Sequence, residues 1–263
     1  GRYKEIVFVE PVEQLMFLAS EQLNGNLATM KENAKTNFIQ LYSLAKKNNI
    51  LSESLSLETA KKLYPLDPIA ASCLTFSIQR YGQNERSLFS FLAATGRGSL
   101  RDYEPTETLT YNLANVYDYV TYNFYTSLSS VNSDTMNWRA MQGAIERIES
   151  GIIPNNMVAN CSKLVKTIGM LNLFCRRVRL DDAFIRTYAE NALDVKNADK
   201  YIEKLVSNKI IRFASYKSQY ILFEGTDIDI ESELYKAAAI VPVPSVGVED
   251  IAPYVKQKAM MAV

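Results

Sequence analysis

The sequence predicts a mostly α-helical protein, with a helical bundle over the first 150 residues, followed by three further helices and a β-hairpin. Three observations support this prediction. Apolar residues recur at helical spacing through most of the chain, and capping residues precede several of these segments. Strand-like runs of β-branched and aromatic residues are short and lie at residues 2–9 and 210–223. With 263 residues, of which 48% are hydrophobic, the chain can bury a sizeable core.

The first part of the chain begins with the predicted strand at residues 2–9 and continues as a series of helices. Pro11 stands directly before the first helix, at a position where its missing N–H is not needed. Glycine, asparagine and proline residues separate the helices that follow. The predicted helices span residues 12–23, 27–47, 56–64, 68–81, 85–94, 108–128 and 135–149.

Polar side chains mark several of these helix starts, because they can accept hydrogen bonds from the free N–H groups of a first turn. Ser56 precedes a short helix, and Asp67 is followed by Pro68 at the first helical position. Ser133 and Asp134 precede the helix at residues 135–149. The sequence therefore predicts that Asp67 caps one helix and that Ser133 with Asp134 caps the other.

The second part of the chain has the order of a winged-helix domain. Helices are predicted at residues 156–174, 181–192 and 197–208, and alternating runs at 210–214 and 219–223 flank a polar turn, as in a β-hairpin. Three helices followed by a hairpin are a variant of the helix-turn-helix unit. A further helix at residues 230–240 and a linker-like tail with several prolines are expected beyond it.

Charge and composition exclude several function classes. Lys plus Arg and Asp plus Glu both number 29, so no global basic field attracts nucleic acid and any such binding must be local. The chain contains no histidine, which excludes Ser-His-Asp catalysis, Cys-His catalysis and histidine-bound metal. Chemistry in this chain would have to rest on carboxylates, Arg, Lys or Tyr.

The cysteines and the apolar runs indicate the cellular compartment in which the protein is expected. Cys73, Cys161 and Cys175 are odd in number, lack CxxC spacing and lie in apolar helical stretches, which predicts buried free thiols in a reducing cytoplasm. The longest apolar runs fall far short of the ~20 residues of a bilayer span. We therefore expect a cytoplasmic protein with no membrane partner and no metal.

The segment GQNERSLFSFL, residues 82–92, is the most informative in the chain. It ends one helix at Gly82, caps the next with Asn84 and places Arg86 in that helix's first turn. A cation at a helix N-terminus is disfavoured by roughly 0.3–1 kcal/mol. An anion is therefore expected to compensate, either the neighbouring Glu85 or the phosphate of a ligand held by another part of the protein.

Two other motifs have structural interpretations. Gly96-Arg97-Gly98-Ser99 lacks the GxxxxGK[ST] spacing of a phosphate loop and follows a helix, so it is interpreted as a helix-ending turn. The tyrosines between residues 111 and 125 recur at helical spacing among leucines and valines. This pattern favours a bundle core over a surface that stacks nucleobases.

Nucleic-acid binding is a secondary expectation for the winged-helix part. In DNA-binding proteins of this type, the third helix of the domain lies in the major groove of DNA. In the predicted helix at residues 197–208, the acidic residues at positions 199 and 203 lie among the basic residues. Binding to a phosphate backbone needs a larger excess of basic over acidic residues than this. The candidate DNA contacts are Lys200, Lys204, Lys209 and Lys217.

Three stretches resemble the end of an AAA+-type ATPase module. GRYKEIVFVEPVEQLMFLASEQL resembles its arginine-bearing loop, last core strand and following helix. YPLDPIAASCLTFSIQRYGQNERSLFSFL resembles the lid helices that carry the arginine called sensor 2, and is similar to large bacterial P-loop ATPases, including those of BREX-type phage-defence systems. YIEKLVSNKIIRFASYKSQYILFEGTDIDIE resembles the winged helix after that lid.

The resemblance implies a role for each residue of the central motif. Arg86 would reach the γ-phosphate of ATP in the parent protein, Asn84 would cap the helix, and Glu85 would orient Arg86 or pair with it. Arg2 is a weaker candidate for a contact to nucleotide in a neighbouring subunit. The Walker A lysine and Walker B acid that hold ATP and Mg²⁺ in such ATPases would lie upstream of Gly1, so no cofactor and no hydrolysis are expected of this chain alone.

These expectations divide the chain into four segments. Residues 1–24 would be a strand–helix remnant of an ATPase core, 25–150 a helical lid-like bundle, 151–227 a winged-helix domain, and 228–263 a C-terminal helix and linker-like tail. The leading hypothesis is a non-catalytic regulatory part of a large bacterial ATPase. It would couple nucleotide state to the rest of the parent protein, to neighbouring subunits or to DNA through rigid-body motion of lid and winged helix.

Two alternatives stay open at this stage. One is a winged-helix DNA-binding regulator whose helical bundle dimerises or senses a ligand. The other is a protein-interaction scaffold in which every motif is structural.

Overall fold

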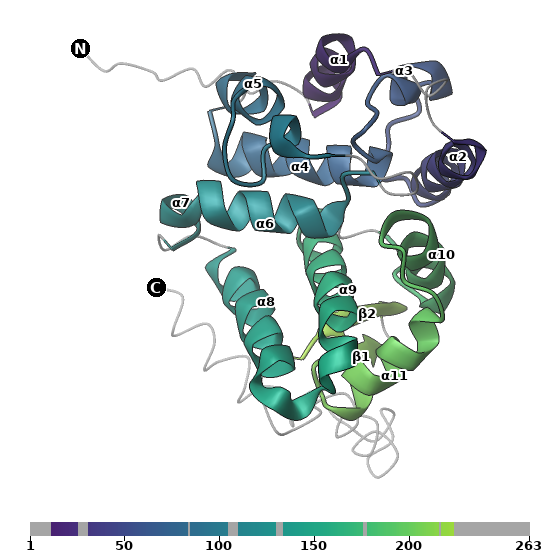
Figure 1. Ribbon diagram of the computed structural model, residues 1–263, viewed down its shortest axis with the longest axis vertical. Coiled ribbons are helices and arrows are strands. Elements are labelled where there is room, and N and C mark those ends of the chain that lie inside the picture. The colour runs from purple at the N-terminus through teal and green to yellow at the C-terminus, as the bar shows by residue number, and fades with distance from the viewer. Residues whose placement is uncertain are drawn as a thin grey trace, which may run out of the picture. The chain divides into compact units, whose positions relative to one another are not determined.

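The computed structural model describes residues 12–25, 31–83, 85–104, 110–129, 134–175, 178–215 and 217–223. These residues form eleven α-helices and one two-stranded antiparallel sheet (Figure 1). The helices are α1 (Val12–Leu23), α2 (Glu32–Lys47), α3 (Leu57–Lys61), α4 (Pro68–Tyr81), α5 (Glu85–Ala93), α6 (Leu113–Asn123), α7 (Tyr125–Ser129), α8 (Thr135–Arg147), α9 (Asn155–Phe174), α10 (Asp182–Ala192) and α11 (Ala198–Ser207), and the strands are β1 (Ile211–Ala214) and β2 (Gln219–Leu222). A 3₁₀ turn, η2 (Leu100–Asp102), follows α5, and a π-helical turn, η3 (Ile148–Ile152), follows α8.

The predicted helix starts at Ser56 and Asp67 are confirmed. The Ser56 side chain accepts a hydrogen bond from Thr59 N at 3.1 Å. The Asp67 carboxylate accepts hydrogen bonds from Ile69 N and Ala70 N, each at 2.8 Å, and Pro68 occupies the first helical position. These contacts satisfy N–H groups that a helix cannot pair internally.

The structure corrects two predictions about the tyrosine-rich segment and the helix after it. Helix α6 begins at Leu113, not near residue 108, because Asn112 caps it in a capping box with Asn115. The predicted helix at 108–128 is broken after Asn123, and α7 begins at Tyr125. Asp134 makes no side-chain cap, and its carboxylate instead accepts hydrogen bonds from Arg80 and Tyr81 of α4. The predicted strand at 2–9 and helix at 230–240 lie outside the described residues.

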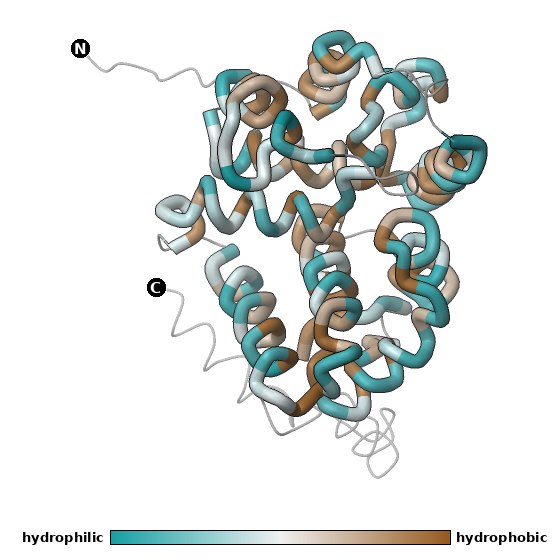
Figure 2. The backbone as a smooth tube through the Cα atoms, in the orientation of Figure 1, coloured by the Kyte–Doolittle hydropathy of each residue, from teal (hydrophilic) through white to brown (hydrophobic). Residues whose placement is uncertain are grey.

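Helix α4 is the centre of the packing. Ten of its fourteen residues are buried, and it contacts α1, α2, α5, α6 and α9. Apolar and small side chains make up most of α4, because a helix surrounded by others needs them on nearly all sides. Figure 2 shows hydrophobic residues gathered where helices face one another and hydrophilic residues on their outer turns.

The described elements of the first three predicted segments share one core. The described residues between 12 and 223 form one compact unit. Helix α6 lies between α4 and α9, and α2 packs against α10, so contacts cross the predicted boundary at residue 150. Gly169 of α9 lets α8 approach closely, since a Cβ at this position would lie 2.4 Å from the Met141 side chain.

A buried polar network ties three of these helices together at the start of α4. The Tyr188 hydroxyl of α10 donates to Asp67 Oδ2 at 2.7 Å and accepts from Leu113 N at 2.9 Å. Asp67 is fully buried, and this desolvation raises the pKa of its carboxyl to about 6, against the opposing effect of its hydrogen-bond donors. The start of α4 is thereby tied to the start of α6 and to α10.

The predicted hairpin is confirmed after the last helix. Strands β1 and β2 pair antiparallel, with Ile211 opposite Leu222 and Phe213 opposite Tyr220. Tyr220 N donates to Leu180 O at 2.9 Å, and β2 packs against α9. The order of three helices, α9 to α11, followed by a hairpin is therefore present in the structure.

Candidate functional site

The connection between α4 and α5 holds the motif that the sequence singled out. Gly82 ends α4, and its N–H donates to Ile78 O at 2.8 Å. A side chain does not fit here, because a Cβ on Gly82 would lie 2.7 Å from Ser87 Oγ and 2.8 Å from Ile78 O. The glycine therefore lets the first turn of α5 lie directly against the end of α4.

Hydrogen bonds fix the first turn of α5. Ser87 Oγ accepts from Gln83 N at 2.7 Å, and Arg86 N donates to Gln83 O at 3.2 Å. On the core side of the helix, the Phe91 ring lies edge-on to the rings of Tyr111 and Tyr119, with centroids 5.3 and 4.8 Å away. The backbone that carries Arg86 is thus anchored from both sides.

Arg86 is exposed on this turn. Its guanidinium donates to Gln83 Oε1 at 3.4 Å, which is longer than the usual 2.7–3.2 Å of such hydrogen bonds. Glu85 is also exposed, and no ion pair joins it to Arg86 within the described ranges. The carboxylate that sequence reasoning offered as a compensating anion is therefore not placed to compensate this cation.

An apolar side chain lies on the same side of α5 as Arg86. Phe89 follows Arg86 by three residues, a spacing that puts both on one helix face, and it is exposed. Phe17 of the adjoining helix α1 is exposed as well. The outer surface of α1 and α5 thus combines a cation that has no acidic partner among the described residues with exposed aromatic rings. Asn84 and Arg2, the other residues predicted for this site, lie outside the described residues.

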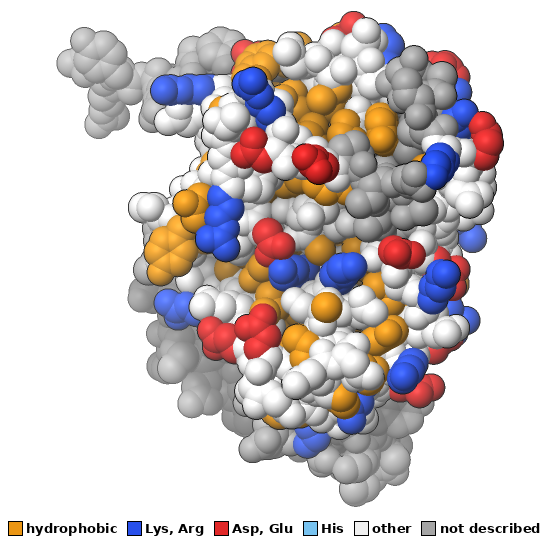
Figure 3. All heavy atoms as spheres, viewed as in Figure 1, with side chains coloured by type: hydrophobic (Ala, Val, Ile, Leu, Met, Phe, Trp, Pro, Cys, Tyr) orange, Lys and Arg blue, Asp and Glu red, His pale blue; other side chains and the backbone are white. Residues whose placement is uncertain are grey.

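The four lysines predicted to contact DNA do not form a basic surface of their own. Lys200, Lys209 and Lys217 are exposed and Lys204 is half-buried. The exposed acids Asp199 and Glu203 lie on the same helix as Lys200, and Asp199 pairs with Arg186. On the face drawn in Figure 3, basic and acidic side chains alternate without a large area of one sign. This charge distribution gives little attraction to a phosphate backbone.

One basic cavity was missed by sequence reasoning. A cavity of about 560 Å³ lies between the Gly96–Ser99 turn, α6 and α9, and is lined by Arg97, Gly98, Asp118, Thr121, Tyr122 and Lys166. The Arg97 guanidinium lies over the Tyr122 ring at 5.1 Å, and Lys166 pairs with Asp118 at 2.7 Å. Its two cations come from positions far apart in sequence, so no local motif could show that they line one cavity. The turn itself is confirmed, with Ser99 N bound to Gly96 O at 2.9 Å.

The described residues contain no group of three or more Cys, Asp or Glu side chains arranged to hold a metal ion. Within the same residues, every helix is too short or too polar to cross a bilayer.

Comparison of the whole chain with protein-family models, with curated proteins and with solved structures found no match in any of the three.

Proposed function

We propose that this chain is the regulatory part of a large AAA+-type ATPase, in which Arg86 senses the γ-phosphate of bound ATP. Helices α2 to α8 would serve as the lid, and α9 to β2 as a winged helix that engages a partner. The phosphate cradle and Mg²⁺ would be supplied by another part of the same protein. The proposal rests on the sequence resemblance and on one structural observation, the setting of Arg86.

That observation is an arginine at an electrostatically unfavourable position that no described acid offsets. The helix N-terminus repels the guanidinium, and its contact to Gln83 is long. Gly82, Ser87 and the ring contacts of Phe91 nevertheless hold the turn in place. A preorganised and poorly neutralised cation is suited to an anionic ligand, because little rearrangement is needed when the anion arrives.

The packing supplies a route from this arginine to the rest of the unit. Helix α5 packs on α4, and α4 contacts α9, the first helix of the three that precede the hairpin. Motion of Arg86 toward or away from a phosphate would therefore move α4 with α5 as a packed body. In this proposal, the exposed Phe89 beside Arg86 is part of the surface that meets the ATPase core.

The proposal is tested in the full-length protein by comparing Arg86→Ala with Arg139→Ala. Arg139 is an exposed arginine of α8, a helix that makes its main contacts with α7, α9, η3 and the hairpin. We expect Arg86→Ala to lower kcat for ATP hydrolysis by at least about tenfold, because arginines on a transferred phosphoryl group contribute strongly to its stabilisation. Arg139→Ala should leave kcat within about twofold of the wild-type value.

Two results would overturn this proposal. One is an unchanged kcat and an unchanged ATP-dependent conformational response in Arg86→Ala. The other is a full-length coding sequence without a P-loop before the residue numbered 1 here.

Duplex DNA is the alternative partner, favoured by the order of three helices and a hairpin and disfavoured by the acids on α11. Titration of the chain against a DNA duplex at rising salt tests this alternative. Binding at low salt that weakens steeply with salt would support a DNA-binding regulator, because phosphate neutralisation releases counterions. Absence of binding at low salt would remove it.

A further inference from the structure

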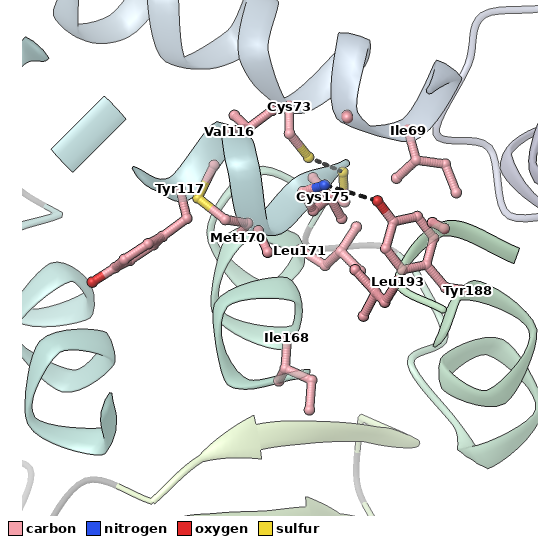
Figure 4. Packing of buried hydrophobic residues seen from close by; sticks show 14 of the residues in the cluster. Ile69, Cys73, Val116, Tyr117, Ile168, Met170, Leu171, Cys175, Tyr188 and Leu193 are labelled. Atoms are coloured by element: carbon pink, nitrogen blue, oxygen red, sulfur yellow. Dashed lines mark hydrogen bonds between the residues drawn. The ribbon is translucent and has the colours of Figure 1, made fainter. Parts of the chain in front are cut away.

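Two of the three cysteines meet in the core. Cys73 lies in α4 and Cys175 directly follows α9, 102 residues further along the chain, yet their Sγ atoms are 3.7 Å apart. Figure 4 shows the two sulfur atoms pointing toward each other beside Tyr188. A disulfide needs an Sγ–Sγ distance of ~2.05 Å, so the two thiols are already neighbours that a small shift can join.

A cavity leads from the surface to one member of the pair. It has a volume of about 560 Å³ and is lined by Asn49, Ile50, Phe76, Gln79, Arg80, Leu173, Phe174, Cys175 and Val178. Cys175 is 8% exposed, whereas Cys73 is 0% exposed and does not line this cavity. A small oxidant that enters the cavity therefore reaches Cys175 first.

The two thiols differ in their surroundings as well. The hydrogen bond with Cys175 and burial raise the pKa of the Cys73 thiol, and the buried Asp67 carboxylate adds to this effect. Cys73 is thereby kept as a protonated thiol behind Cys175. The third cysteine, Cys161, lies fourteen residues before Cys175 on α9, about 21 Å along the helix axis, and cannot reach the pair.

We propose that Cys73 and Cys175 form a reversible redox site that a peroxide oxidises to a disulfide. Hydrogen peroxide first transfers an oxygen atom to Cys175, which gives a sulfenic acid and one water. The Cys73 sulfur then attacks the Cys175 sulfur, the S–S bond forms, and the sulfenic hydroxyl leaves with the Cys73 proton as a second water. The peroxide is reduced by two electrons that the two thiols lose, and a dithiol restores both thiols by exchange.

The position of Cys175 allows the shift that this bond requires. It has left the helical conformation, with φ −120° and ψ 52°, and follows the last turn of α9. The disulfide would link α4 to the end of α9 and so fix the lid-like helices to the helices before the hairpin. The redox site does not depend on the proposed ATPase role, although the link would restrict the motion on which that role depends.

The test is thiol titration of the chain after treatment with hydrogen peroxide under native conditions. The reduced chain has three thiols. We expect the count after denaturation to fall to one, with a Cys73–Cys175 peptide that is two hydrogen atoms lighter than the separate peptides, and to return to three after a dithiol. In Cys161→Ser the count should fall from two to none at the same rate.

A second variant identifies the order of the steps. In Cys73→Ser, Cys175 should accumulate as a sulfenic acid that dimedone traps, because no resolving thiol remains. Three surviving thiols, cross-links that involve Cys161, or a Cys73–Cys175 bond that a dithiol does not reduce in the folded chain would overturn the proposal. These readouts need neither ATP nor the full-length protein, so their failure leaves the Arg86 proposal to be judged separately.

Discussion

Asp67 is the residue with the most unusual environment in this unit, since it is a carboxylate without solvent contact at the start of the central helix. Both of its oxygens accept hydrogen bonds, Oδ1 from two backbone N–H groups and Oδ2 from the Tyr188 hydroxyl. The hydrogen bonds of Asp67 therefore stabilise the folded state, whereas burial of its ionised carboxylate destabilises it. The balance between these effects depends on pH.

The free energy of unfolding should carry this pH dependence. The pKa of Asp67 is about 6 in the folded chain and near 3.8 when unfolded. The contribution of this shift to the free energy of unfolding is therefore fully present below pH 3.8 and is lost as pH rises through 6. Asp67→Asn cannot ionise. Between pH 4 and pH 7 the stability of the variant relative to wild type should rise by about 2–3 kcal/mol. Urea unfolding at both values measures this, and parallel pH profiles would contradict it.

Tyr81 belongs to a cluster of four side chains at the other end of α4, together with Arg80, Asp134 and Trp138. Its hydroxyl accepts from Trp138 Nε1 at 2.9 Å and donates to Asp134 Oδ2 at 2.8 Å, while Arg80 pairs with the same carboxylate oxygen. The Asp134 side chain does not cap α8 because its carboxylate accepts hydrogen bonds from these two residues of α4 instead. The one tryptophan of the chain thus reports on this cluster.

Tyr81→Phe should lower the free energy of unfolding by about 1–3 kcal/mol, because it leaves the indole N–H and the carboxylate without this partner. The emission of Trp138 should shift in the folded state as its hydrogen bond is lost. Tyr125→Phe is the matched control, since Tyr125 is 71% exposed, and should change stability by less than about 0.5 kcal/mol. Equal effects of the two variants would contradict the cluster.

At the scale of elements, the turn between α4 and α5 depends on Gly82. Gly82→Ala should destabilise the unit by about 1–3 kcal/mol, because the new methyl group meets Ile78 O and the Ser87 side chain. Gly143→Ala is the matched control, since no atom lies within 4 Å of a Cβ there and α8 gains roughly 0.5–1 kcal/mol from the loss of glycine. Thermal unfolding of both variants checks the pair, and similar signs would refute the argument.

Local signals predicted helices well where the signal lay in adjacent residues. Asp67-Pro68 marked the start of α4, and alternating runs with a polar turn marked the hairpin, because caps and turns involve neighbours in the chain. The prediction of a side-chain cap at Asp134 was wrong because the partners of its carboxylate, Arg80 and Tyr81, are more than fifty positions away in the sequence. No local pattern contains such a contact.

The same division applies to the candidate sites. The sequence located Arg86 because its signal is local: a glycine, a first helical turn and a cation. It did not show that Arg97 and Lys166 line one cavity, or that Cys73 meets Cys175, since these arrangements arise from the packing of α6 and α4 on α9. Long-range sites of this kind are known only when the helices are placed.

At the scale of the whole described unit, the predicted lid-like and winged-helix parts lack separate cores. Helix α9 is buried along most of its length, and it contacts α4, α6 and α8 from the first part as well as α11 and β2 from the second. Asn112 Nδ2 also donates to Ala192 O at 3.0 Å across the predicted boundary. A fragment of residues 151–223 would therefore expose much of the apolar surface of α9.

Residues 12–223 should unfold in one cooperative transition for this reason. Far-UV circular dichroism follows all the helices, whereas the fluorescence of Trp138 follows α8 and the end of α4. We expect the two urea curves to coincide, because neither group of helices can keep its core when the other is lost. The fragment 151–223 should show no such transition. Two separated transitions, or a fragment that unfolds cooperatively by itself, would show instead that the boundary near residue 150 divides two independent domains.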